Sequence, residues 1–340
     1  MTVEELPVEG FERVVVDRAP GGALRSVIAV HDTTLGPALG GVRMRPYDNE
    51  EAAVAECLAL ARAMTLKAAA TGLELGGGWS VIPGDVSAKT PELLLAHGRA
   101  IASLAGRFIP VNDVGTDQDD LRKIGEVAAP VCAQGDPSPW TALGVAAGIL
   151  ACARHLGHTE LTGLRVGVQG AGHVGSALVH LLAEAGAEVL VSDVVAERAE
   201  TVAESVGAEV VDPGALLTRE LDVLAPCALG GVVTPASVGE LRCRVIAGGA
   251  NNVLASTRLA EDLLARGIVY APDFCVNAGG AIFLQEQLLG HDHEAIRRRV
   301  LTVGEVITDL LTHATTDGIP TTQAAHDLAN ARLAKAAAAD

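Results

Sequence analysis

The sequence predicts an α/β protein of two domains, the second built on a parallel sheet. The chain has 340 residues, which is enough for two buried cores. From residue 164 on, branched apolar segments alternate with helical ones, a pattern typical of parallel strands joined by right-handed crossovers. The turn-forming run 135–139 (GDPSP) precedes this alternation. We therefore expect domains over 1–136 and 137–320, with a last helix, about 320–340, that packs back on the first domain.

The first domain is expected to mix strands and helices. Residues 13–17 and 24–31 have the branched apolar character of strands. A helix is expected to begin at Asp48 or Asn49 and to end at Gly72, because negative charge follows the cap and apolar residues recur at helical spacing. Lys67 then lies on the last turns of this helix.

Further along the first domain, a glycine-rich turn is expected to lead into a short strand over 79–82. A helix over 91–104 and a strand over 107–111 follow. The strand over 107–111 would deliver Asn112 and Asp113 at its carboxyl end.

The second domain is expected to open with a long helix over 139–155 that bridges the two halves. Strands and helices then alternate over 164–169, 173–185, 188–193 and 196–206. The Ala-rich residues 332–340 are expected to form a helix tail.

A dinucleotide fingerprint lies at the first junction of this alternation. The motif GAGHVG follows the apolar strand RVGVQ and opens a helix, where free N–H groups and the positive end of the helix dipole attract phosphates. Gly170 permits the tight turn, Gly172 lets the backbone approach the pyrophosphate, and Gly175 lets the helix lie close to the strand. Asp193 ends the next strand, 18 residues beyond Gly175, where a carboxylate accepts both ribose hydroxyls and repels a 2′-phosphate. The sequence thus predicts a Rossmann-type domain that binds NAD rather than NADP.

Composition narrows the choice of partners and compartment. The net charge of −17 disfavours nucleic acid and anionic membrane surfaces as partners. The apolar runs are too short to span a membrane, and the N-terminus lacks the pattern of a secretory signal. The cysteines are scattered without CxxC pairs or nearby His clusters, so we expect no metal site, no disulfide framework and a cytoplasmic location.

A series of further motifs resembles one known family along most of the chain. They are GPALGGVRMRPY (36–47), ARAMTLKAAATGLELGGG (61–78), NDVGTD (112–117), GDPSPWTALGV (135–145), APCALGG (225–231), GGANN (248–252) and YAPDFCVNAGG (270–280). In this order they resemble the Glu/Leu/Phe/Val dehydrogenase family, in its leucine, valine and phenylalanine dehydrogenase branch. The resemblance implies an α/β substrate domain, a Rossmann domain and an active site in the cleft between them. It also implies oxidation of an L-amino acid to the 2-oxo acid and ammonia with NAD, and assembly into homo-oligomers such as dimers or octamers.

The resemblance also implies roles for individual residues. Lys67 matches the lysine that holds the substrate α-carboxylate, and Asp113 matches the acid that supports proton transfer and the substrate amine. Alone, Lys67 could be an exposed helix-end lysine and Asp113 a helix cap. The remaining matched positions are Gly40, Gly41, Met64 and Asn277 for the substrate, and Thr141, His173, Val174, Cys227, Ala228, Asn251 and Asn277 for the cofactor.

Trp79 departs from the family pattern. The family has a catalytic lysine after the glycines, whereas this chain reads GGGWSVI with Trp79 12 residues after Lys67, which is the family's spacing between its two lysines. In the family that lysine activates water and moves protons, whereas an indole N–H is only a donor. A positioned general base contributes about 10²–10⁴ in rate. Hydride transfer depends on the alignment of two carbons and could survive the change.

The two tryptophans suggest a reshaped pocket, in which Trp140 would contact the substrate. Trp79 and Trp140 both fall in segments that match the family's active site. Alternatively, each fills a gap in a core or covers a hinge.

Two functions follow. The first is an NAD-dependent oxidoreductase acting on an amino acid, or a derived imine or amine, with altered proton transfer. The second is a catalytically inactive homologue that binds NAD or an amino acid as a sensor or partner subunit.

Overall fold

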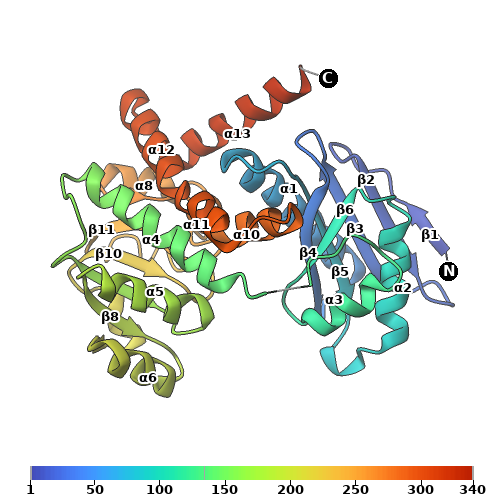
Figure 1. The fold of residues 1–340 in the computed structure, drawn as a ribbon, viewed down its shortest axis with the longest axis horizontal. Coiled ribbons are helices and arrows are strands. Elements are labelled where there is room, and N and C mark those ends of the chain that lie inside the picture. The colour runs from blue at the N-terminus through green and yellow to red at the C-terminus, as the bar shows by residue number, and fades with distance from the viewer. Residues whose placement is uncertain (1, 134, 339–340) are drawn as a thin grey trace. The chain divides into compact units, whose positions relative to one another are not determined.

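The computed structural model describes residues 2–133 and 135–338, which divide into two compact units (Figure 1). The first unit contains the residues up to Gly135 together with the residues from Ala329 on. The second unit runs from Asp136 to Leu328. The division falls inside helix α13 (Thr321–Ala337), so the end of this helix belongs to the first unit. Residues 339 and 340 of the expected helix tail lie outside the described residues.

The first unit is built on a mixed sheet with strand order β1-β2-β3-β5-β4-β6. β1, β2, β3 and β5 pair antiparallel in turn, whereas β4 is parallel to both β5 and β6. The strands are β1 (Thr2–Glu5), β2 (Arg13–Arg18), β3 (Leu24–Asp32), β4 (Ala38–Arg45), β5 (Gly76–Pro83) and β6 (Phe108–Asn112).

Helices cover both faces of this sheet, as Figure 1 shows. Helix α1 (Glu50–Ala70) packs against β3 and β5 on one face. Short helix η1 (Val86–Ala88) is followed on the other face by α2 (Pro91–Ala102) and α3 (Gln118–Gly125). Successive residues of β2 enter opposite cores because side chains alternate along a strand. The central strands are therefore buried on both sides. At the start of α1, Asn49 caps the helix by accepting a hydrogen bond from the amide of Ala52.

The glycines before Trp79 form part of strand β5, so the expected turn over 76–78 is wrong. The strand lies tightly against its neighbours: a Cβ at Gly77 would lie 2.1 Å from Thr65 Oγ1 of α1. A Cβ at Gly78 would lie 2.7 Å from Cδ2 of Phe108. Glycine at these positions permits close packing of helix and strand rather than a bend.

The second unit has a fully parallel sheet with strand order β12-β11-β10-β7-β8-β9. The order reverses beside β7, and in such sheets ligands bind at the carboxyl ends of the strands at this switch point. The expected Rossmann-type sheet is thus confirmed. The strands are β7 (Arg165–Gln169), β8 (Glu188–Ser192), β9 (Glu209–Val210), β10 (Leu221–Pro226), β11 (Cys243–Ile246) and β12 (Val269–Tyr270).

The helices of the second unit begin with α4 (Ser138–His155), which packs against α5, α10 and α12. The others are α5 (His173–Glu184), α6 (Ala196–Val206), α7 (Pro213–Leu216), α8 (Leu259–Ala265), α9 (Asp273–Val276), α10 (Gly279–Leu288), α11 (His293–Leu301) and α12 (Val303–Asp317).

The C-terminal residues are anchored within the first unit. The Arg332 guanidinium donates to the carbonyls of Ala68 and Ala69 at 3.1 and 3.2 Å, and to that of Leu73 at 2.8 Å. These carbonyls lie at the end of α1, where a cation is favourable.

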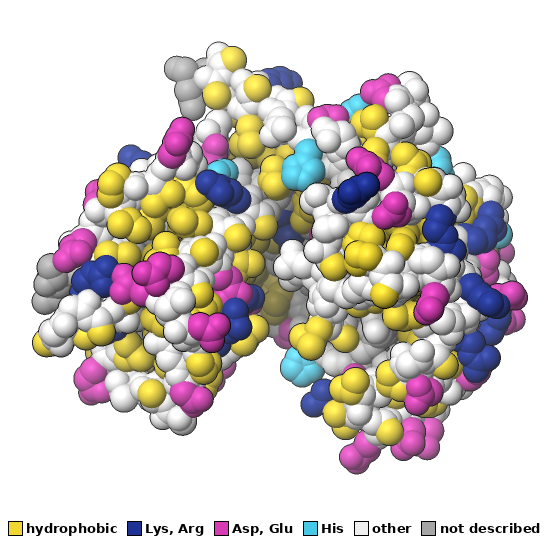
Figure 2. Space-filling model, turned by 180° about the vertical axis from the view of Figure 1, so that it is seen from behind, with side chains coloured by type: hydrophobic (Ala, Val, Ile, Leu, Met, Phe, Trp, Pro, Cys, Tyr) yellow, Lys and Arg dark blue, Asp and Glu magenta, His cyan; other side chains and the backbone are white. Residues whose placement is uncertain are grey.

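Two features of the structure relate to the choice of partners: the distribution of charged side chains on the surface, and the length and polarity of the helices. On the face that Figure 2 shows, acidic and basic side chains are interspersed over both units. Among the described residues, no helix is long and apolar enough to cross a bilayer.

Candidate active site

Gly41, Trp79 and Asp113 meet on adjacent strands of the first unit. β4 pairs with β5 on one side and with β6 on the other, with Gly41 opposite Val111. A Cβ at Gly41 would lie 2.6 Å from Cζ2 of Trp79 and 2.8 Å from Cβ of Asp113. A Cβ at Gly40 would lie 1.8 Å from the carbonyl oxygen of Gly78. Both glycines are therefore required by close packing, and the indole and the carboxylate lie side by side over β4.

The Trp79 indole is half-buried on the face that α1 covers. Its ring packs against the core that includes Val14, Ala29 and Cys57. The indole Nε1 is buried and has no hydrogen-bond partner in the described part of the chain. The Cys57 thiol donates to the Trp79 carbonyl at 3.3 Å, and burial raises the pKa of this thiol, so it remains a donor.

Asp113 is paired with Arg43, a residue that the sequence analysis did not single out. Arg43 Nε donates to Asp113 Oδ2 at 2.6 Å, and Nη1 donates to Glu56 Oε1 at 2.9 Å. The Arg43 Cζ lies 5.5 Å from the centre of the Trp79 ring. Burial lowers the pKa of Arg43, but the bond and charge of Asp113 and Glu56 raise it by more. Arg43 therefore stays charged.

The other oxygen of Asp113 is available to a ligand. Within the described residues, Oδ1 makes no hydrogen bond, and about a fifth of the side chain is exposed, at 21%. The backbone amide of Asp113 donates to Thr116 Oγ1 at 3.0 Å, and this hydroxyl donates to the carbonyl of Val42 at 2.7 Å. The loop that carries the carboxylate is thus fixed to β4.

Lys67 and Met64 lie on the last turns of α1, as predicted. Both side chains are half-buried and are three residues apart, so they share a face of the helix. The Lys67 carbonyl accepts from the amide and the hydroxyl of Thr71, at 3.1 and 2.6 Å, which ends the helix.

On the opposite face of the sheet, a hydrogen-bonded relay supports Gly41. Ser80 Oγ donates to the Gly41 carbonyl at 3.2 Å, and His97 Nε2 lies 3.1 Å from Ser80 Oγ. Burial lowers the pKa of His97 to about 4, so the imidazole is neutral. Because the hydroxyl proton points to Gly41, we assign the His97 proton to Nε2.

The fingerprint loop in the second unit has the backbone that its glycines predict. Gly170 has φ +100°, and its amide donates to the Ser192 carbonyl at 2.7 Å. A Cβ at Gly175 would lie 1.8 Å from the Gly170 oxygen, whereas the space around Gly172 is open. In the part of the chain that the structure describes, no side chain caps α5 at Gly172, so its first-turn amides are left for an anion.

Asp193 adjoins this loop. Its Oδ2 accepts from the amide of Ala171 at 2.7 Å, and its Oδ1 accepts from the amide of Val195 at 2.8 Å. Each oxygen retains a second lone pair for a hydroxyl. His173 and Val174 open α5, with His173 exposed and Val174 half-buried.

The remaining cofactor positions gather at the ends of β10 and β11. The Cys227 amide donates to the Gln169 carbonyl at 2.7 Å, and a Cβ at Gly170 would lie 2.8 Å from Ala228 Cβ. The buried Asn277 donates through Nδ2 to Asn251 Oδ1 at 2.7 Å. The same Nδ2 also bonds the carbonyls of the two residues before Asn251, each at 3.3 Å.

Two exposed apolar side chains flank the same loops and were not singled out from the sequence. Val194, directly after Asp193, is 91% exposed, and Leu229, directly after Ala228, is 86% exposed. Apolar side chains beside a few polar groups are typical of the residues that bind cofactors. A Rossmann dinucleotide therefore fits the residues present.

Thr141 and Trp140 lie at the start of α4. Thr141 Oγ1 donates to the Pro137 carbonyl at 3.1 Å. A Cβ at Gly280 would lie 2.6 Å from Thr141 Oγ1. Trp140 stacks on Phe283 with ring centres 5.4 Å apart and meets the edge of His293 at 5.7 Å. The Trp140 ring thus packs between α4, α10 and α11.

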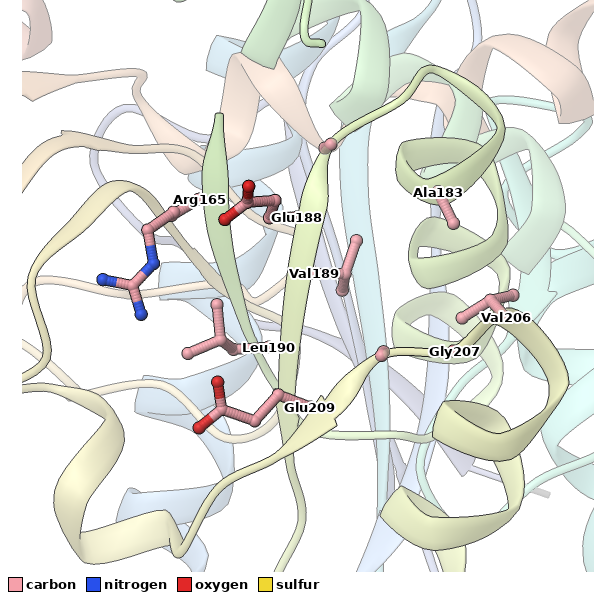
Figure 3. Close-up of a pocket in the computed structure, with 10 residues that line it drawn as sticks. Arg165, Ala183, Glu188, Val189, Leu190, Val206, Gly207 and Glu209 are labelled. Carbon is pink, nitrogen blue, oxygen red and sulfur yellow. The ribbon is translucent and has the colours of Figure 1, made fainter. Parts of the chain in front are cut away.

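A cavity of about 360 Å³ opens at the other end of the second sheet (Figure 3). Its lining includes Arg165, Glu188 and Glu209, the first residues of β7, β8 and β9. It therefore lies at the amino ends of the strands and not beside the fingerprint. Among the described residues, no cluster of His, Cys, Asp and Glu has the arrangement of a metal site.

Comparisons with known proteins cover nearly the whole chain. Residues 12–127 match the Glu/Leu/Phe/Val dehydrogenase dimerisation domain, and residues 191–340 match the Glutamate/Leucine/Phenylalanine/Valine dehydrogenase domain. Residues 145–228 match the NAD-binding domain of D-isomer specific 2-hydroxyacid dehydrogenases.

Similar proteins and structures agree with these matches. The leucine dehydrogenase of Bacillus subtilis is 41% identical over 95% of this chain and 91% of that protein. The valine dehydrogenase of Streptomyces albus is 45% identical over 97% of this chain and 94% of that protein. The crystal structure of L-tryptophan dehydrogenase from Nostoc punctiforme superposes with a TM-score of 0.87 at 39% identity, over 96% of each chain.

Fold, fingerprint and relatives together define a nicotinamide-dependent oxidoreductase of amino acids. More particularly, the chain belongs to the Glu/Leu/Phe/Val dehydrogenase family. These comparisons do not favour the catalytically inactive alternative.

Proposed function

We propose that this protein is an NAD-linked dehydrogenase or reductase of an α-carboxylated amine or imine, with proton transfer altered by Trp79. The position of Trp79 carries the proposal: its indole lies over Gly41, beside Asp113, where the family resemblance implies a basic lysine. Gly41 and Asp113, which surround the indole and match the family pattern, support a functional site rather than one that has lost its activity.

The substrate is proposed to be held by the first-unit residues and by Asn277. Lys67 would pair with the substrate carboxylate, which the reaction leaves unchanged. Gly40, Gly41 and Met64 would form the adjoining wall. Trp140, also proposed for the substrate in the sequence analysis, has a packing role in its stack with Phe283, and a substrate contact would be additional.

The cofactor is proposed to be NAD. Asp193 supports this choice because its carboxylate adjoins the phosphate-binding loop and would repel a 2′-phosphate. Gly170, Gly172, His173, Val174 and Gly175 would hold the pyrophosphate, and Thr141, Cys227, Ala228, Asn251 and Asn277 the nicotinamide half. When bound, the nicotinamide ring accepts or donates the hydride.

Proton transfer is proposed to pass through Asp113. Oxidation of a CH–NH₂ carbon releases a hydride and a proton, and attack of water on the resulting imine requires a base. The Trp79 indole has only a donor, and the Arg43 guanidinium stays charged. Asp113 Oδ1, or a water that it binds, is the remaining acceptor in the group around Gly41.

The proposal is tested by assaying NAD reduction with a panel of L-amino acids, and NADH oxidation with 2-oxo acids plus ammonia and with preformed cyclic imines. We expect turnover with at least one α-carboxylated amine or imine, faster for substrates that need no attack of water. Binding of NADH without turnover in either direction would refute the proposal.

We further propose a cytoplasmic homo-oligomer. The scatter of the cysteines along the sequence, without CxxC pairs, supports a reducing compartment. The match of residues 12–127 to a dimerisation domain supports assembly, and light scattering during size exclusion would give the number of subunits.

A further inference from the structure

The Arg43 guanidinium is fixed by contacts on three sides. It binds Asp113 through Nε at 2.6 Å and Glu56 through Nη1 at 2.9 Å, and its Cζ lies 5.5 Å from the Trp79 ring centre. The side chains of Arg43, Asp113 and Glu56 are 18%, 21% and 23% exposed. Such partly shielded, charge-assisted bonds are stronger and more directional than exposed ion pairs.

Glu56 is in turn held by two other side chains. Arg45 donates to Oε1 at 3.0 Å and to Oε2 at 3.0 and 3.2 Å, and the Tyr47 hydroxyl donates to Oε2. Burial, followed by the bond to Glu56, raises the pKa of Tyr47 to about 12, so the hydroxyl keeps its proton. Glu56 therefore gives Arg43 a fixed anchor on α1.

The Asp113 carboxylate is thereby oriented by one residue. Its main chain is tied to β4 through Thr116, and its Oδ2 is tied to the same strand through Arg43. Among the described residues, Asp113 bonds Arg43 from β4 and Thr116 from its own loop, and Glu56 of α1 acts through Arg43. The uncharged Trp79 of β5 lies beside Asp113 over Gly41. Oδ1 is left without a hydrogen bond in the described residues.

We propose that Arg43 is a positioning residue for the reaction: it holds the Asp113 carboxylate by Oδ2 and presents Oδ1 to the substrate amine. The inference rests on the proposed role of Asp113 in proton transfer. Arg43 provides the positive charge beside Asp113 in a site where Trp79 provides none. It acts only through Asp113 and exchanges no proton itself.

A set of variants separates this role from a structural one. Arg43→Gln removes the charge beside Asp113, whereas Arg43→Lys retains it. Arg45→Gln is the matched control, because Arg45 binds the same Glu56 but does not contact Asp113. Asp113→Asn and the double variant Arg43→Gln/Asp113→Asn complete a double-mutant cycle. The values of kcat and KM of each variant are measured with the best wild-type substrate.

We expect Arg43→Gln to lower kcat at least about tenfold with little change in KM, as for loss of an interaction with the reacting group. Arg43→Lys should restore most of this loss, because it returns a positive charge beside Asp113. Arg45→Gln should lower kcat by less than Arg43→Gln does, and the double variant should be no slower than Asp113→Asn.

Several outcomes would overturn the inference. Equal losses of kcat in Arg43→Gln and Arg45→Gln would show that the network is only structural, and additive losses in the cycle would show that Arg43 does not act through Asp113. If circular dichroism shows that Arg43→Gln is unfolded, Arg43→Lys decides, since a folded Arg43→Lys variant with a kcat as low as that of Asp113→Asn contradicts the inference. A wild type without turnover refutes the proposed function itself, and the inference with it.

Discussion

The indole of Trp79 lies so close to Gly41 that a methyl group on residue 41 would be 2.6 Å from Cζ2. That methyl would also be 2.8 Å from Cβ of Asp113. Glycine at this position therefore lets one strand carry an aromatic ring and a carboxylate side by side.

Substitution of Gly41 by Ala is expected to destabilise the protein by about 1–3 kcal/mol, because overpacking must move the indole or the Asp113 loop. Urea unfolding measures the loss. Gly239→Ala is the control, since a Cβ there meets nothing within 4 Å. The destabilisation caused by Gly41→Ala should be smaller, but not zero, when it is measured in a Trp79→Ala background, because the contact of the added methyl group with Asp113 remains. An equal destabilisation with and without the indole would contradict this account.

Trp79→Lys is expected to raise oxidative deamination of a small aliphatic amino acid by about 10²-fold or more, as a base returns beside Asp113. The measurement is the rate of NAD reduction by the purified variant. Trp79→Gln is the control, because it also removes the indole but adds no base. Equal rates for the folded Lys and Gln variants would show that a base at residue 79 does not limit the reaction.

Substitution of Asp193 is expected to shift the cofactor preference. Asp193→Asn and Asp193→Ser should raise kcat/KM for NADP relative to NAD about tenfold or more, because the repulsion of a 2′-phosphate is lost. Asn retains an acceptor for the Ala171 amide, so it separates loss of charge from loss of the loop contact. An unchanged ratio in both variants would exclude Asp193 as the determinant.

His97 makes stability depend on pH. Burial lowers its pKa to about 4, so between about pH 4 and the ordinary value of 6.5 the unfolded chain binds more protons than the folded one. The contribution of His97 to the free energy of unfolding is therefore fully present above about pH 6.5. It decreases by up to about 3 kcal/mol as the pH falls toward 4. The free energy of unfolding, measured with urea at several pH values between these limits, should fall less steeply with falling pH for His97→Phe than for the wild type. His180→Gln, which removes an exposed imidazole, is the control for the loss of a histidine outside the core.

Local signals in the sequence located much of the fold. A helix from Asp48 or Asn49 to Gly72 was predicted because a capping residue and an acidic first turn lie within a few residues of each other, and the structure has α1 over Glu50–Ala70 with Asn49 as its cap. The fingerprint, Gly170 to Gly175, and the acid at 193 follow from short spacings within one strand–helix–strand unit.

Features that depend on distant residues were not accessible in this way. Residues 76–78 were expected to turn because glycine favours turns, yet packing against Thr65 and Phe108 makes them a strand. Arg43 and Asp113 are 70 residues apart in the sequence, and no periodic pattern predicts their pairing. The strand that carries Arg43, β4, lacks the alternation of a half-exposed strand because both its faces are buried.

The two tryptophans fall in different units, Trp79 in the first and Trp140 in the second, and the sequence has no others. Intrinsic fluorescence therefore contains one native optical probe for each half of the molecule. A Phe substitution at either position isolates the emission of the other, so the melting of each half can be followed separately without any attached dye.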